Sequence, residues 1–351
     1  MAVRGQRGVQ AVGLHAVREK GAVMPGLNES CAQRFAAIDI GTVTCRLLVA
    51  DVDASGVHEV RRAHAITNLG EGVASSGVLL PAAMQRVDEQ MLRFLDIVDE
   101  CRDGIQGDIP LTAVATSAAR DARNADEFTA LLKKRGIELS VIPGEREAEL
   151  SFKGASSSFP PVPLFVVDVG GGSTEIIAGQ AGQAPQFRRS FDIGCRRVTE
   201  LFLHDDPPAR EELERARSWA LGTFVPFFQT VREAGFKGQT MAAVAGTATS
   251  VVAMHLRLEH YDPRRVHLSV IDRETLDALE RSTAAMPLAK RRTIPGLEPD
   301  RAPVIVAGLV ILQAVLDAAG MESFTVSETD ILHGIILDAS LRHGKQDAPT
   351  V

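Results

Sequence analysis

The sequence predicts an α/β protein built from two related lobes that face each other across a cleft. Apolar segments typical of strands alternate with segments typical of helices along the chain. With 351 residues, the chain is longer than a single hydrophobic core usually supports. A pattern of apolar strand, aspartate, glycine-containing turn and second strand occurs twice, at residues 35–52 and 165–180, with Asp39 matching Asp168. Such an internal repeat predicts two related halves.

The first lobe is expected to cover residues 34–158. It opens with an apolar, β-branched hairpin interrupted at residues 41–44. Residues 79–102 carry apolar side chains at helical spacing, with Pro81 suited to the first turn. The remaining predicted elements are, in order, a strand ending near Thr116, a helix stopped by Gly136, a strand, a turn at Pro143 and Gly144, and a helix opening at Glu145.

A linker at residues 156–163 separates the lobes, because its Ser- and Pro-rich composition suits neither a helix nor a central strand. The second lobe is expected to cover residues 159–340, and its last helices are compatible with packing back on the first lobe. After the repeated hairpin, the predicted elements are a helix at 210–228, a turn at 244–251, a helix at 274–286, a basic loop at 290–301 and an apolar helix at 304–319. Residues 1–33 are expected to be either a disordered tail or a segment with a wrongly assigned start, in which case Met24 is the favoured initiator. Residues 341–351 are expected to form a flexible tail.

The composition argues against several classes of protein. A formal net charge of -7 disfavours nucleic-acid binding by bulk electrostatics, since such proteins carry excess lysine and arginine. The four cysteines, Cys31, Cys45, Cys101 and Cys195, form no C-x-x-C pair, so neither a zinc site nor a disulfide framework is predicted. A reducing, cytoplasmic location is therefore expected. No apolar stretch approaches the ~18–20 residues that a membrane-spanning helix needs, so no membrane association is expected.

Asp39 and Asp168 are the first candidate site residues. Each ends an apolar strand and precedes a turn of small residues. A single aspartate in this position usually caps its own turn. Two at matching places in a repeat favour a shared site, because two buried carboxylates repel each other unless a cation lies between them. Mg²⁺ with retained water ligands fits this need, with Mn²⁺ as the alternative, so both aspartates are predicted metal ligands.

The run of three glycines at residues 170–172 indicates a phosphate cradle. Without Cβ atoms, these residues allow close approach to a ligand and let successive backbone N–H groups bind an anion. Ser173 and Thr174 add hydroxyl donors. The turn at residues 42–44, with Arg46 nearby, offers a similar cradle from the first lobe. Two cradles facing each other across a metal predict a phosphoryl-transfer site, and the spacing fits neither a dinucleotide-binding fingerprint nor a P-loop.

The chain resembles the exopolyphosphatase/guanosine-pentaphosphate phosphohydrolase (Ppx/GppA) family in six ordered motifs: AAIDIGTVTCRLLV, ATSAARDARNADEF, IPGEREAEL, VVDVGGGSTEI, SFDIGCRRVTE and VAGTATSV. The similarity runs from about residue 35 to about residue 334. That family belongs to the actin-like ATPase superfamily. The resemblance therefore implies two actin-like (ribonuclease H-like) domains with an interdomain active-site cleft. It also implies a homodimer, in a short form that lacks the C-terminal HD-like domain of longer relatives.

The resemblance assigns roles to matching positions. Glu147 in GEREAEL matches the proposed general base that deprotonates the attacking water, although the residue types alone would favour a solvated acid on a helix face. Nearby phosphate oxygens would raise the pKa of Glu147 toward the range that suits a base. Asp168 and Glu175 match residues linked to metal binding and catalysis. The positions expected to bind phosphate are Gly41, Thr42, Val43, Thr44, Cys45, Arg46, Thr116, Ser117, Arg120, Gly170, Gly171, Gly172, Ser173, Thr174, Gly246 and Thr247.

Three positions depart from the usual pattern of that family. Val43 stands where an asparagine is usual, and Asn68 stands where an arginine is common. The late Leu-Arg-Glu-Gly element of the family is replaced by Ile-Leu-His-Gly at residues 331–334, so Leu332 stands in place of the arginine. These changes are expected to affect chain-length preference and rate more than reaction class. His267 and His333 are expected to be structural or surface residues, because no second His or Cys lies at a ligand spacing beside them.

The predicted function is metal-dependent hydrolysis of the terminal phosphate of inorganic polyphosphate by water that Glu147 activates. The first alternative substrate is guanosine pentaphosphate (pppGpp), whose purine would need an apolar slot, for example near Gly246 and Thr247. Less favoured alternatives are a sugar kinase of the same superfamily and a non-catalytic polyphosphate or nucleotide sensor. Five arginines could either form a basic rim that binds a long polyanion or simply be exposed to solvent, and the sequence favours neither interpretation. They are Arg264, Arg265, Arg291, Arg292 and Arg301.

Overall fold

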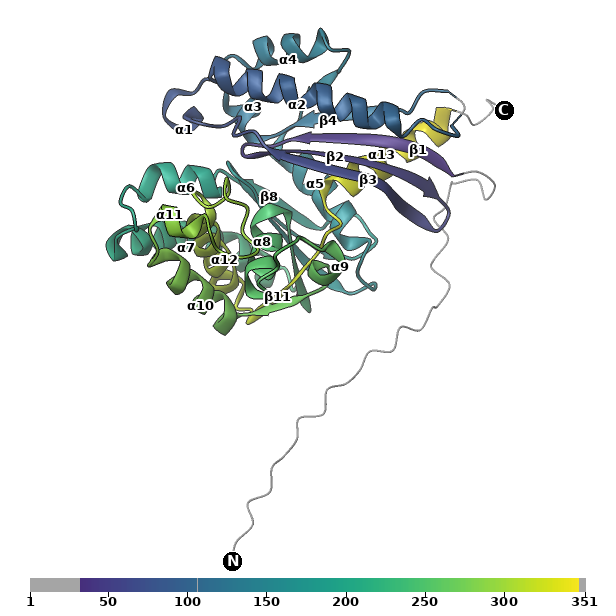
Figure 1. The fold of residues 1–351 in the computed structure, drawn as a ribbon. Coiled ribbons are helices and arrows are strands. Elements are labelled where there is room, and N and C mark those ends of the chain that lie inside the picture. The colour runs from purple at the N-terminus through teal and green to yellow at the C-terminus, as the bar shows by residue number, and fades with distance from the viewer. Residues whose placement is uncertain (1–31, 106, 347–351) are drawn as a thin grey trace, which may run out of the picture.

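The computed structural model describes residues 32–105 and 107–346, which fold into two lobes, each built on one mixed sheet (Figure 1). The first sheet has the strand order β3-β2-β1-β4-β5. Its strands are β1 (Gln33–Ile40), β2 (Thr44–Asp53), β3 (Gly56–Ile66), β4 (Leu111–Ala115) and β5 (Leu139–Val141). β1, β2 and β3 form an antiparallel meander, whereas β4 and β5 run parallel to β1.

Strand β1 is buried on both faces, which explains its continuous apolar run. The helices of this lobe are α1 (Val73–Ser76), α2 (Pro81–Glu100), α3 (Ser117–Asp121) and α4 (Ala125–Lys133). Ala36, Ile38 and Ile40 pack with residues of these helices on one face of the sheet. Phe35 and Ala37 point to the opposite face and pack with the last helix of the chain, α13 (Ile331–Gln346).

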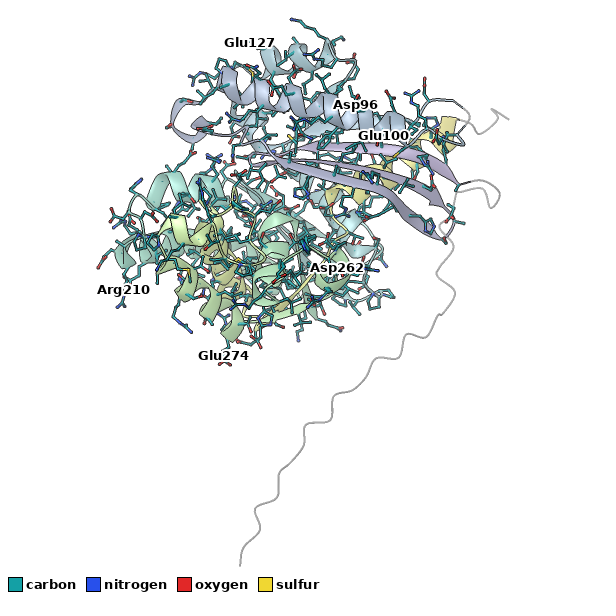
Figure 2. The ribbon with its side chains drawn as sticks, in the orientation of Figure 1. Asp96, Glu100, Glu127, Arg210, Asp262 and Glu274 are labelled. Atoms are coloured by element: carbon teal, nitrogen blue, oxygen red, sulfur yellow. The ribbon has the colours of Figure 1, made fainter. Side chains whose placement is uncertain are left out.

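Helix α2 matches the amphipathic helix predicted around residues 79–102. It begins at Pro81, whose missing N–H costs nothing in a first turn. Met91 and Phe94 are buried against the sheet, whereas Asp96 and Glu100 point outward (Figure 2). The helix therefore covers the first sheet with its apolar face.

The second lobe repeats this topology in a sheet of order β10-β11-β9-β6-β7-β8. From the other edge, β8-β7-β6-β9-β11 has the connectivity of β3-β2-β1-β4-β5, and β10 adds one antiparallel edge strand. The strands are β6 (Pro163–Val169), β7 (Thr174–Gln180), β8 (Phe187–Phe191), β9 (Thr240–Val244), β10 (Val270–Asp272) and β11 (Ser323–Val326). The helices are α6 (Cys195–Phe202), α7 (Arg210–Glu233), α8 (Ala245–His255), α9 (Pro263–Val266), α10 (Arg273–Ala284), α11 (Leu288–Arg291) and α12 (Ile305–Ala319). The α/β fold class with two related lobes is confirmed.

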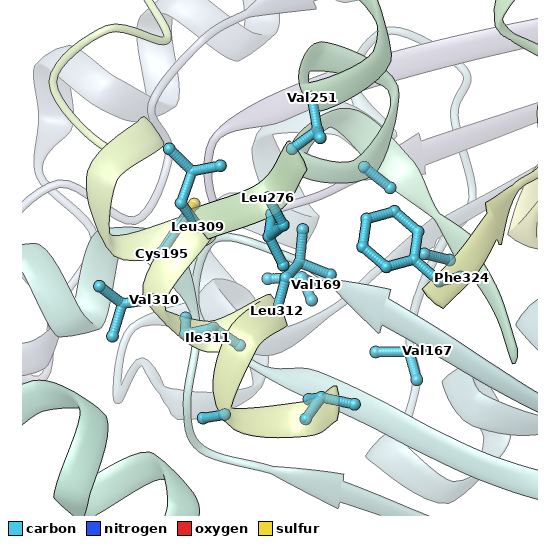
Figure 3. Packing of buried hydrophobic residues seen from close by; sticks show 14 of the residues in the cluster. Val167, Val169, Cys195, Val251, Leu276, Leu309, Val310, Ile311, Leu312 and Phe324 are labelled. Carbon is cyan, nitrogen blue, oxygen red and sulfur yellow. The ribbon is translucent and has the colours of Figure 1, made fainter. Parts of the chain in front are cut away.

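The largest hydrophobic core lies on one face of the second sheet. Leu276 of α10 and Leu309 and Leu312 of α12 pack against the sheet residues Val167 and Phe324 (Figure 3). The phenylalanines of α7 belong to the same core. Helices α7, α10 and α12 thus cover this face of the sheet.

The two hairpins that carry the repeat have the same register and the same turn. Asp39 is paired with Arg46 across β1 and β2, and Asp168 is paired with Glu175 across β6 and β7. The N–H of Gly41 donates to the Thr44 carbonyl at 3.0 Å, and the N–H of Gly170 donates to the Ser173 carbonyl at 3.0 Å. In each lobe, the repeat therefore places an aspartate opposite a charged residue that lies seven positions later in the chain.

Two helices each pack against the sheet of the lobe that does not contain the strand before them. Helix α5 (Gly144–Ser156) follows β5 of the first sheet, yet its residue Phe152 packs with Val166 and Ile177 of the second. Helix α13 follows β11 of the second sheet and packs with the first. The two helices cross at two glycines, where a Cβ on Gly154 would overlap the Asp330 carbonyl and a Cβ on Gly334 would overlap the Leu150 carbonyl. Only glycine permits this backbone-to-backbone contact.

Three features differ from the sequence-based expectations or lie outside the described residues. The turn expected at residues 244–251 is wrong: β9 ends at Val244 and α8 begins directly at Ala245, whose φ is 65°. Helix α13 continues to Gln346, so residues 341–346, expected to be part of a flexible tail, are helical. Residues 1–31 and 347–351 lie outside the described part of the chain. Within the described ranges, none of the helices combines the length and apolar character needed to cross a bilayer.

Candidate active site

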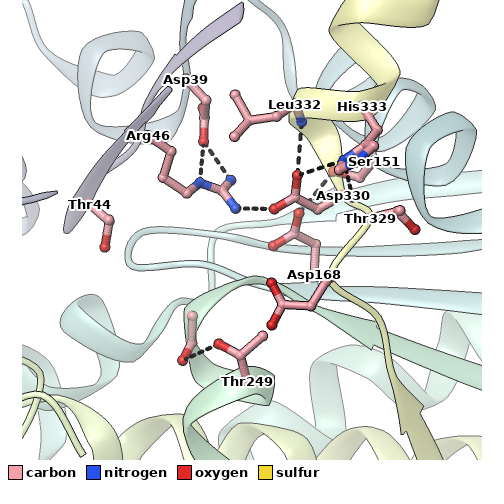
Figure 4. Close-up of polar contacts among 12 residues, drawn as sticks. Asp39, Thr44, Arg46, Ser151, Asp168, Thr249, Thr329, Asp330, Leu332 and His333 are labelled. Atoms are coloured by element: carbon pink, nitrogen blue, oxygen red, sulfur yellow. Dashed lines mark hydrogen bonds and ion pairs between the residues drawn. The ribbon is translucent and has the colours of Figure 1, made fainter. Parts of the chain in front are cut away.

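A cavity lies between the lobes, where the two hairpin turns approach each other (Figure 4). The strand ends of both sheets and the starts of α5 and α8 line it. The predicted site residues that line this cavity are Asp39, Gly41, Thr42, Val43, Thr44, Arg46, Thr116, Glu147, Asp168, Gly170, Gly171, Gly172, Ser173, Gly246 and Thr247. The structure thus brings residues from across the chain into one place.

The other predicted residues lie beside or away from the cavity. Cys45 points to the opposite side of β2, into the core, where its Sγ contacts the Thr67 hydroxyl at 3.2 Å. Alternation along a strand dictates this direction, because both neighbours of Cys45 face the cavity. The Thr174 hydroxyl is occupied by a hydrogen bond to the Ile193 carbonyl. The rest form a second layer next to cavity residues: Ser117, Arg120 and Glu175.

An arginine lies among the carboxylates of the site. Arg46 donates from Nε and Nη2 to Asp39 Oδ2, at 3.0 and 2.5 Å, and from Nη1 to Asp330 Oδ2. Burial is the largest single effect on Asp330 and would raise its pKa, but Arg46, His333 and Arg62 together outweigh burial and hold this pKa below its usual range. For Asp39, burial outweighs Arg46 and raises the pKa. The sequence predicted a cation between Asp39 and Asp168, and the guanidinium of Arg46 supplies part of that positive charge.

Asp168 is held from the helix that crosses between lobes. The hydroxyl of Ser151, on α5, donates to Asp168 Oδ2 at 2.9 Å. Burial raises the pKa of Asp168 to about 6, although Arg46 and Ser151 favour its ionised form. Asp168 therefore gains a proton readily when the pH falls below neutrality.

Glu147 is the most perturbed acid that lines the cavity. It occupies the first turn of α5, is 7% exposed, and accepts a hydrogen bond from Arg120 Nη1 at 3.0 Å. Burial raises the pKa of Glu147 to about 8, against the opposing effect of Arg120. Glu175 is buried nearby and accepts from the Ser190 hydroxyl at 2.7 Å, and both burial and Glu147 raise the pKa of Glu175. This arrangement suits a group that takes up a proton near neutral pH.

The glycines of the second turn allow the two lobes to touch. A Cβ on Gly171 would lie 2.6 Å from Val43 Cγ2, and one on Gly172 would lie 2.7 Å from Thr42 Oγ1. The hydroxyls of Thr42 and Ser117 are buried here with no hydrogen-bond partner among the described residues. Buried hydroxyls without partners are rare, so the hydroxyl of Thr42, which lines the cavity, is placed to donate to an incoming ligand such as a phosphate.

The residues present fit a divalent cation held jointly with a substrate. Among the described residues, no group of three or more His, Cys, Asp or Glu side chains could hold a metal by itself. Mg²⁺ does not require such a cage, because it commonly binds one or two carboxylates, several waters and substrate phosphates. Asp39 Oδ1 is buried and has no hydrogen-bond partner among the described residues, so it could bind such an ion. Asp168, which also lines the cavity, would be the second carboxylate ligand.

Several cavity residues were not predicted from the sequence. Asp330 follows β11 without any glycine turn, so it carried no recognisable signal. Arg301 reaches the cavity from the loop before α12, where its guanidinium covers Gly246. In the sequence, Arg301 is notable only as one of the arginines of the basic loop at residues 290–301. The remaining cavity residues not predicted include Arg62, His64, Tyr261, Glu298 and Glu328.

Among the described residues, neither of the two histidines discussed in the sequence analysis belongs to a group of three or more side chains that could hold a metal ion. His333 is buried, and its Nε2 lies 3.1 Å from Glu59 Oε1. His267 Nδ1 accepts a hydrogen bond from the Glu328 N–H at 3.1 Å. His333 thus joins α13 to β3 of the first sheet, and His267 holds the segment that follows β11 in the second lobe.

Comparison with known proteins is consistent with this geometry. Residues 48–343 match the model of the Ppx/GppA phosphatase family. The chain is 35% identical to Exopolyphosphatase 2 of Mycobacterium tuberculosis over 320 residues, which cover 87% of this chain and 98% of that protein.

Solved structures show the same likeness. A crystal structure described as an exopolyphosphatase-like protein is 34% identical, with a TM-score of 0.80, and the match covers 88% of this chain and 98% of that one. The Ppx/GppA family member of Aquifex aeolicus is 27% identical, with a TM-score of 0.73, over 89% of this chain and 99% of that one. The similarity extends across both lobes and both sides of the cavity.

Proposed function

The chain belongs to the Ppx/GppA phosphatase family, and from this premise we propose that it is an exopolyphosphatase that releases the terminal phosphate of inorganic polyphosphate. The observation that carries the proposal is the position of Glu147, a buried carboxylate with a raised pKa at the wall of a cavity rich in phosphate-binding groups. Hydrolysis of a phosphoric anhydride needs this combination of a base for water and donors for phosphate oxygens.

In the proposed reaction, Glu147 accepts a proton from water as the water oxygen attacks the terminal phosphorus. The bond from that phosphorus to the bridging oxygen breaks, and the shortened chain leaves with the electron pair. Arg46 and the hydroxyl of Thr42, which both line the cavity, stabilise the charge on the phosphate oxygens. Arg120 orients the carboxylate of Glu147. A Mg²⁺ or Mn²⁺ ion at Asp39 and Asp168 would neutralise further phosphate charge when bound.

The surroundings of Gly246 favour polyphosphate over pppGpp. A purine needs an apolar slot, whereas the space beside Gly246 is filled by the Arg301 guanidinium, which also lies 3.3 Å from Glu298 Oε2. A guanidinium at this place suits a phosphate better than an uncharged base. The Asp-based chemistry of sugar kinases is disfavoured because the acid in the cavity wall with the strongly raised pKa is a glutamate on α5.

The decisive experiment compares phosphate release from long-chain polyphosphate, pppGpp and ATP, with Mg²⁺, with Mn²⁺ and with a chelator. Glu147→Gln is expected to lower kcat on polyphosphate by about 10²–10⁴-fold, because it removes the proton acceptor and keeps the shape. Glu145→Gln is the matched control, since Glu145 lies in the same helix turn and is exposed. Full activity in Glu147→Gln would refute the assigned base, and no release from any substrate would favour the sensor.

We also propose that the protein acts in the cytoplasm as a homodimer. The cysteines Cys45, Cys101 and Cys195 are free, which suits a reducing compartment. Light scattering coupled to size-exclusion chromatography measures the oligomeric state directly, and a monomeric mass would refute the dimer.

A further inference from the structure

Asp330 is an acid of the cavity wall that has no part in the reaction described above. It lies between β11 and α13 and is 4% exposed. Both oxygens of its carboxylate have partners: Oδ1 accepts a hydrogen bond from the Leu332 N–H at 3.0 Å, and Oδ2 accepts one from Arg46 Nη1 (Figure 4). The two oxygens therefore connect the start of a helix with an arginine of the cavity.

The first of these contacts caps helix α13. Asp330 directly precedes this helix, and its backbone carbonyl accepts the first hydrogen bond of the helix, from the Gly334 N–H at 3.1 Å. His333 returns the interaction, because its Nδ1 accepts from the Asp330 N–H at 3.4 Å. Aspartate is preferred at this place because its side-chain oxygen satisfies a backbone N–H that has no partner within the helix. The cap fixes the Asp330 side chain relative to α13.

Neighbouring elements hold the backbone of Asp330 in turn. On the side of α5, Gly154 lies so close to the Asp330 carbonyl that a Cβ would overlap it. On the side of the first sheet, His333 is 3% exposed, and its Nε2 lies 3.1 Å from Glu59 Oε1 on β3. The Asp330 carboxylate is thus a fixed point in the cavity wall.

Arg46 is a long side chain that reaches this fixed point from β2. Its Nε and Nη2 donate to Asp39 Oδ2, and its Nη1 donates to Asp330 Oδ2. A guanidinium carries five N–H groups, so these contacts with described residues leave two that can donate to phosphate oxygens. Asp39 alone would hold one edge of the guanidinium. Asp330 holds a second edge and thereby sets the direction of the two remaining N–H groups.

We propose that Asp330 is a positioning residue, which holds the guanidinium of Arg46 in the orientation that donates to the oxygens of the phosphate being transferred. The inference rests on the proposed exopolyphosphatase function and adds a residue to it. Bound substrate can shift to meet a displaced guanidinium, whereas the transition state has a fixed geometry. Asp330 should therefore support kcat and contribute little to substrate binding.

The test separates the contact with Arg46 from the helix cap. Asp330→Ser keeps a side-chain oxygen that can cap α13 but lacks the oxygen that contacts Arg46, whereas Asp330→Ala removes both. Both variants should lower kcat on tripolyphosphate by about 10²-fold, measured per folded protein. KM should be unchanged or lower, because a negative charge is removed from the cavity wall. A normal kcat in Asp330→Ser would show that Asp330 only caps the helix and would overturn the proposal.

Circular dichroism at the assay temperature gives the folded fraction of each variant. Asp330→Asn is the second variant, in case Asp330→Ser fails to fold. It keeps the size of the side chain and an oxygen for the cap, and it places an amide where Arg46 needs an acceptor. It should show the same loss of kcat, and a normal kcat in this variant would equally overturn the proposal.

A double-mutant cycle with Arg46→Ala gives a readout that a purely structural role of Asp330 would not produce. If Asp330 acts through Arg46, Asp330→Ser should cause no further loss of kcat in the Arg46→Ala background, because no guanidinium remains to be oriented. A further loss of about 10²-fold in that background would show that the two residues act independently, and it would overturn the proposal.

The matched control is Asp272→Ala at the cap of another helix. The Asp272 side chain accepts from the Thr275 N–H at 2.8 Å at the start of α10, is exposed, and is not part of the cavity wall. This variant should melt at a lower temperature with an unchanged kcat. An equal loss of kcat would show that removal of any cap reduces activity, and it would overturn the proposal. If the unmodified protein hydrolyses no polyphosphate, the proposed function fails and this inference fails with it, whereas an active protein with a normal Asp330→Ser variant refutes the inference alone.

Discussion

Burial raises the pKa of the acids of this site, whereas neighbouring arginines lower it. Asp330 and Asp39 share one guanidinium, yet the pKa of Asp330 is lowered and the pKa of Asp39 is raised. The pKa of Glu147 rises to about 8 despite its hydrogen bond to Arg120, because burial is the larger effect. Each acid therefore has a protonation state that its residue type alone does not reveal.

The raised pKa of Glu147 predicts the pH dependence of activity. A general base must be ionised to accept a proton, so kcat/KM should rise as the pH increases toward about 8 and should level off above it. Initial rates on tripolyphosphate at saturating Mg²⁺ across this range provide the measurement. The small residual rate of Glu147→Gln should lack this rise. A rate of the unmodified protein that is constant from acidic to alkaline pH would contradict the assignment.

At the level of single residues, the sequence was informative where a local pattern carries the chemistry. Asp39, Asp168 and the glycines at 170–172 were recognisable because an acid and a turn occur together twice. Asp330 was not, since its role depends on contact with Arg46, 284 residues earlier in the chain. Cys45 shows the opposite case: it lies within a motif, but strand alternation turns it into the core.

At the level of elements, the crossing of α5 and α13 depends on glycine. Gly154→Ala is expected to destabilise the protein by about 1–3 kcal/mol, because the new Cβ would overlap the Asp330 carbonyl and force the helices apart. Activity should fall as well, since Glu147 and Ser151 lie on the same helix. Chemical denaturation followed by circular dichroism measures the change in the free energy of unfolding.

A helix glycine in open space is the control for this substitution. A Cβ on Gly222, in α7, would meet nothing within 4 Å, and Gly222 is exposed. Gly222→Ala is therefore expected to be neutral or to stabilise the protein by up to about 1 kcal/mol. Equal effects of the two substitutions would contradict the steric explanation.

The helix α8 illustrates why some elements escaped prediction. Small and hydroxylated residues at 244–251 resemble a turn when they are read locally. In the structure, α8 begins there without a connecting loop, and its small side chains let it pack closely: Gly308 of α12 approaches Thr247 so nearly that a Cβ would overlap the threonine methyl. Tertiary packing thus outweighs local turn propensity at this point. By contrast, the hairpins and α2 have strong periodic patterns and were predicted correctly.

At the level of the whole molecule, each lobe depends on a helix supplied by the other. Phe35 and Ala37 of the first sheet are covered by α13, and Val166 of the second is covered by α5. The structure therefore predicts a single cooperative unfolding transition rather than one for each lobe. Trp219, the only tryptophan of the chain, lies against the core of the second lobe, so its fluorescence reports that lobe alone.

Circular dichroism, in contrast, reports both lobes, and the two denaturation curves should coincide. A fluorescence transition that is displaced from the dichroism transition would show that the second lobe unfolds independently. Such a result would also mean that a cut near residues 156–163 could yield separate stable pieces, which the exchange of helices argues against.

The glycine crossing has a consequence for the origin of the molecule. Gly154 meets the carbonyl of Asp330, four residues before Gly334, and Gly334 meets the carbonyl of Leu150, four residues before Gly154. This reciprocal pattern is the one expected of an isologous interface, in which identical partners meet about a two-fold axis. The chain is thus arranged as two copies of an ancestral half would be in a domain-swapped dimer, each lending its final helix to the other. The two hairpins depart from this symmetry at one matching position, where Arg46 is paired with Asp39 and Glu175 with Asp168.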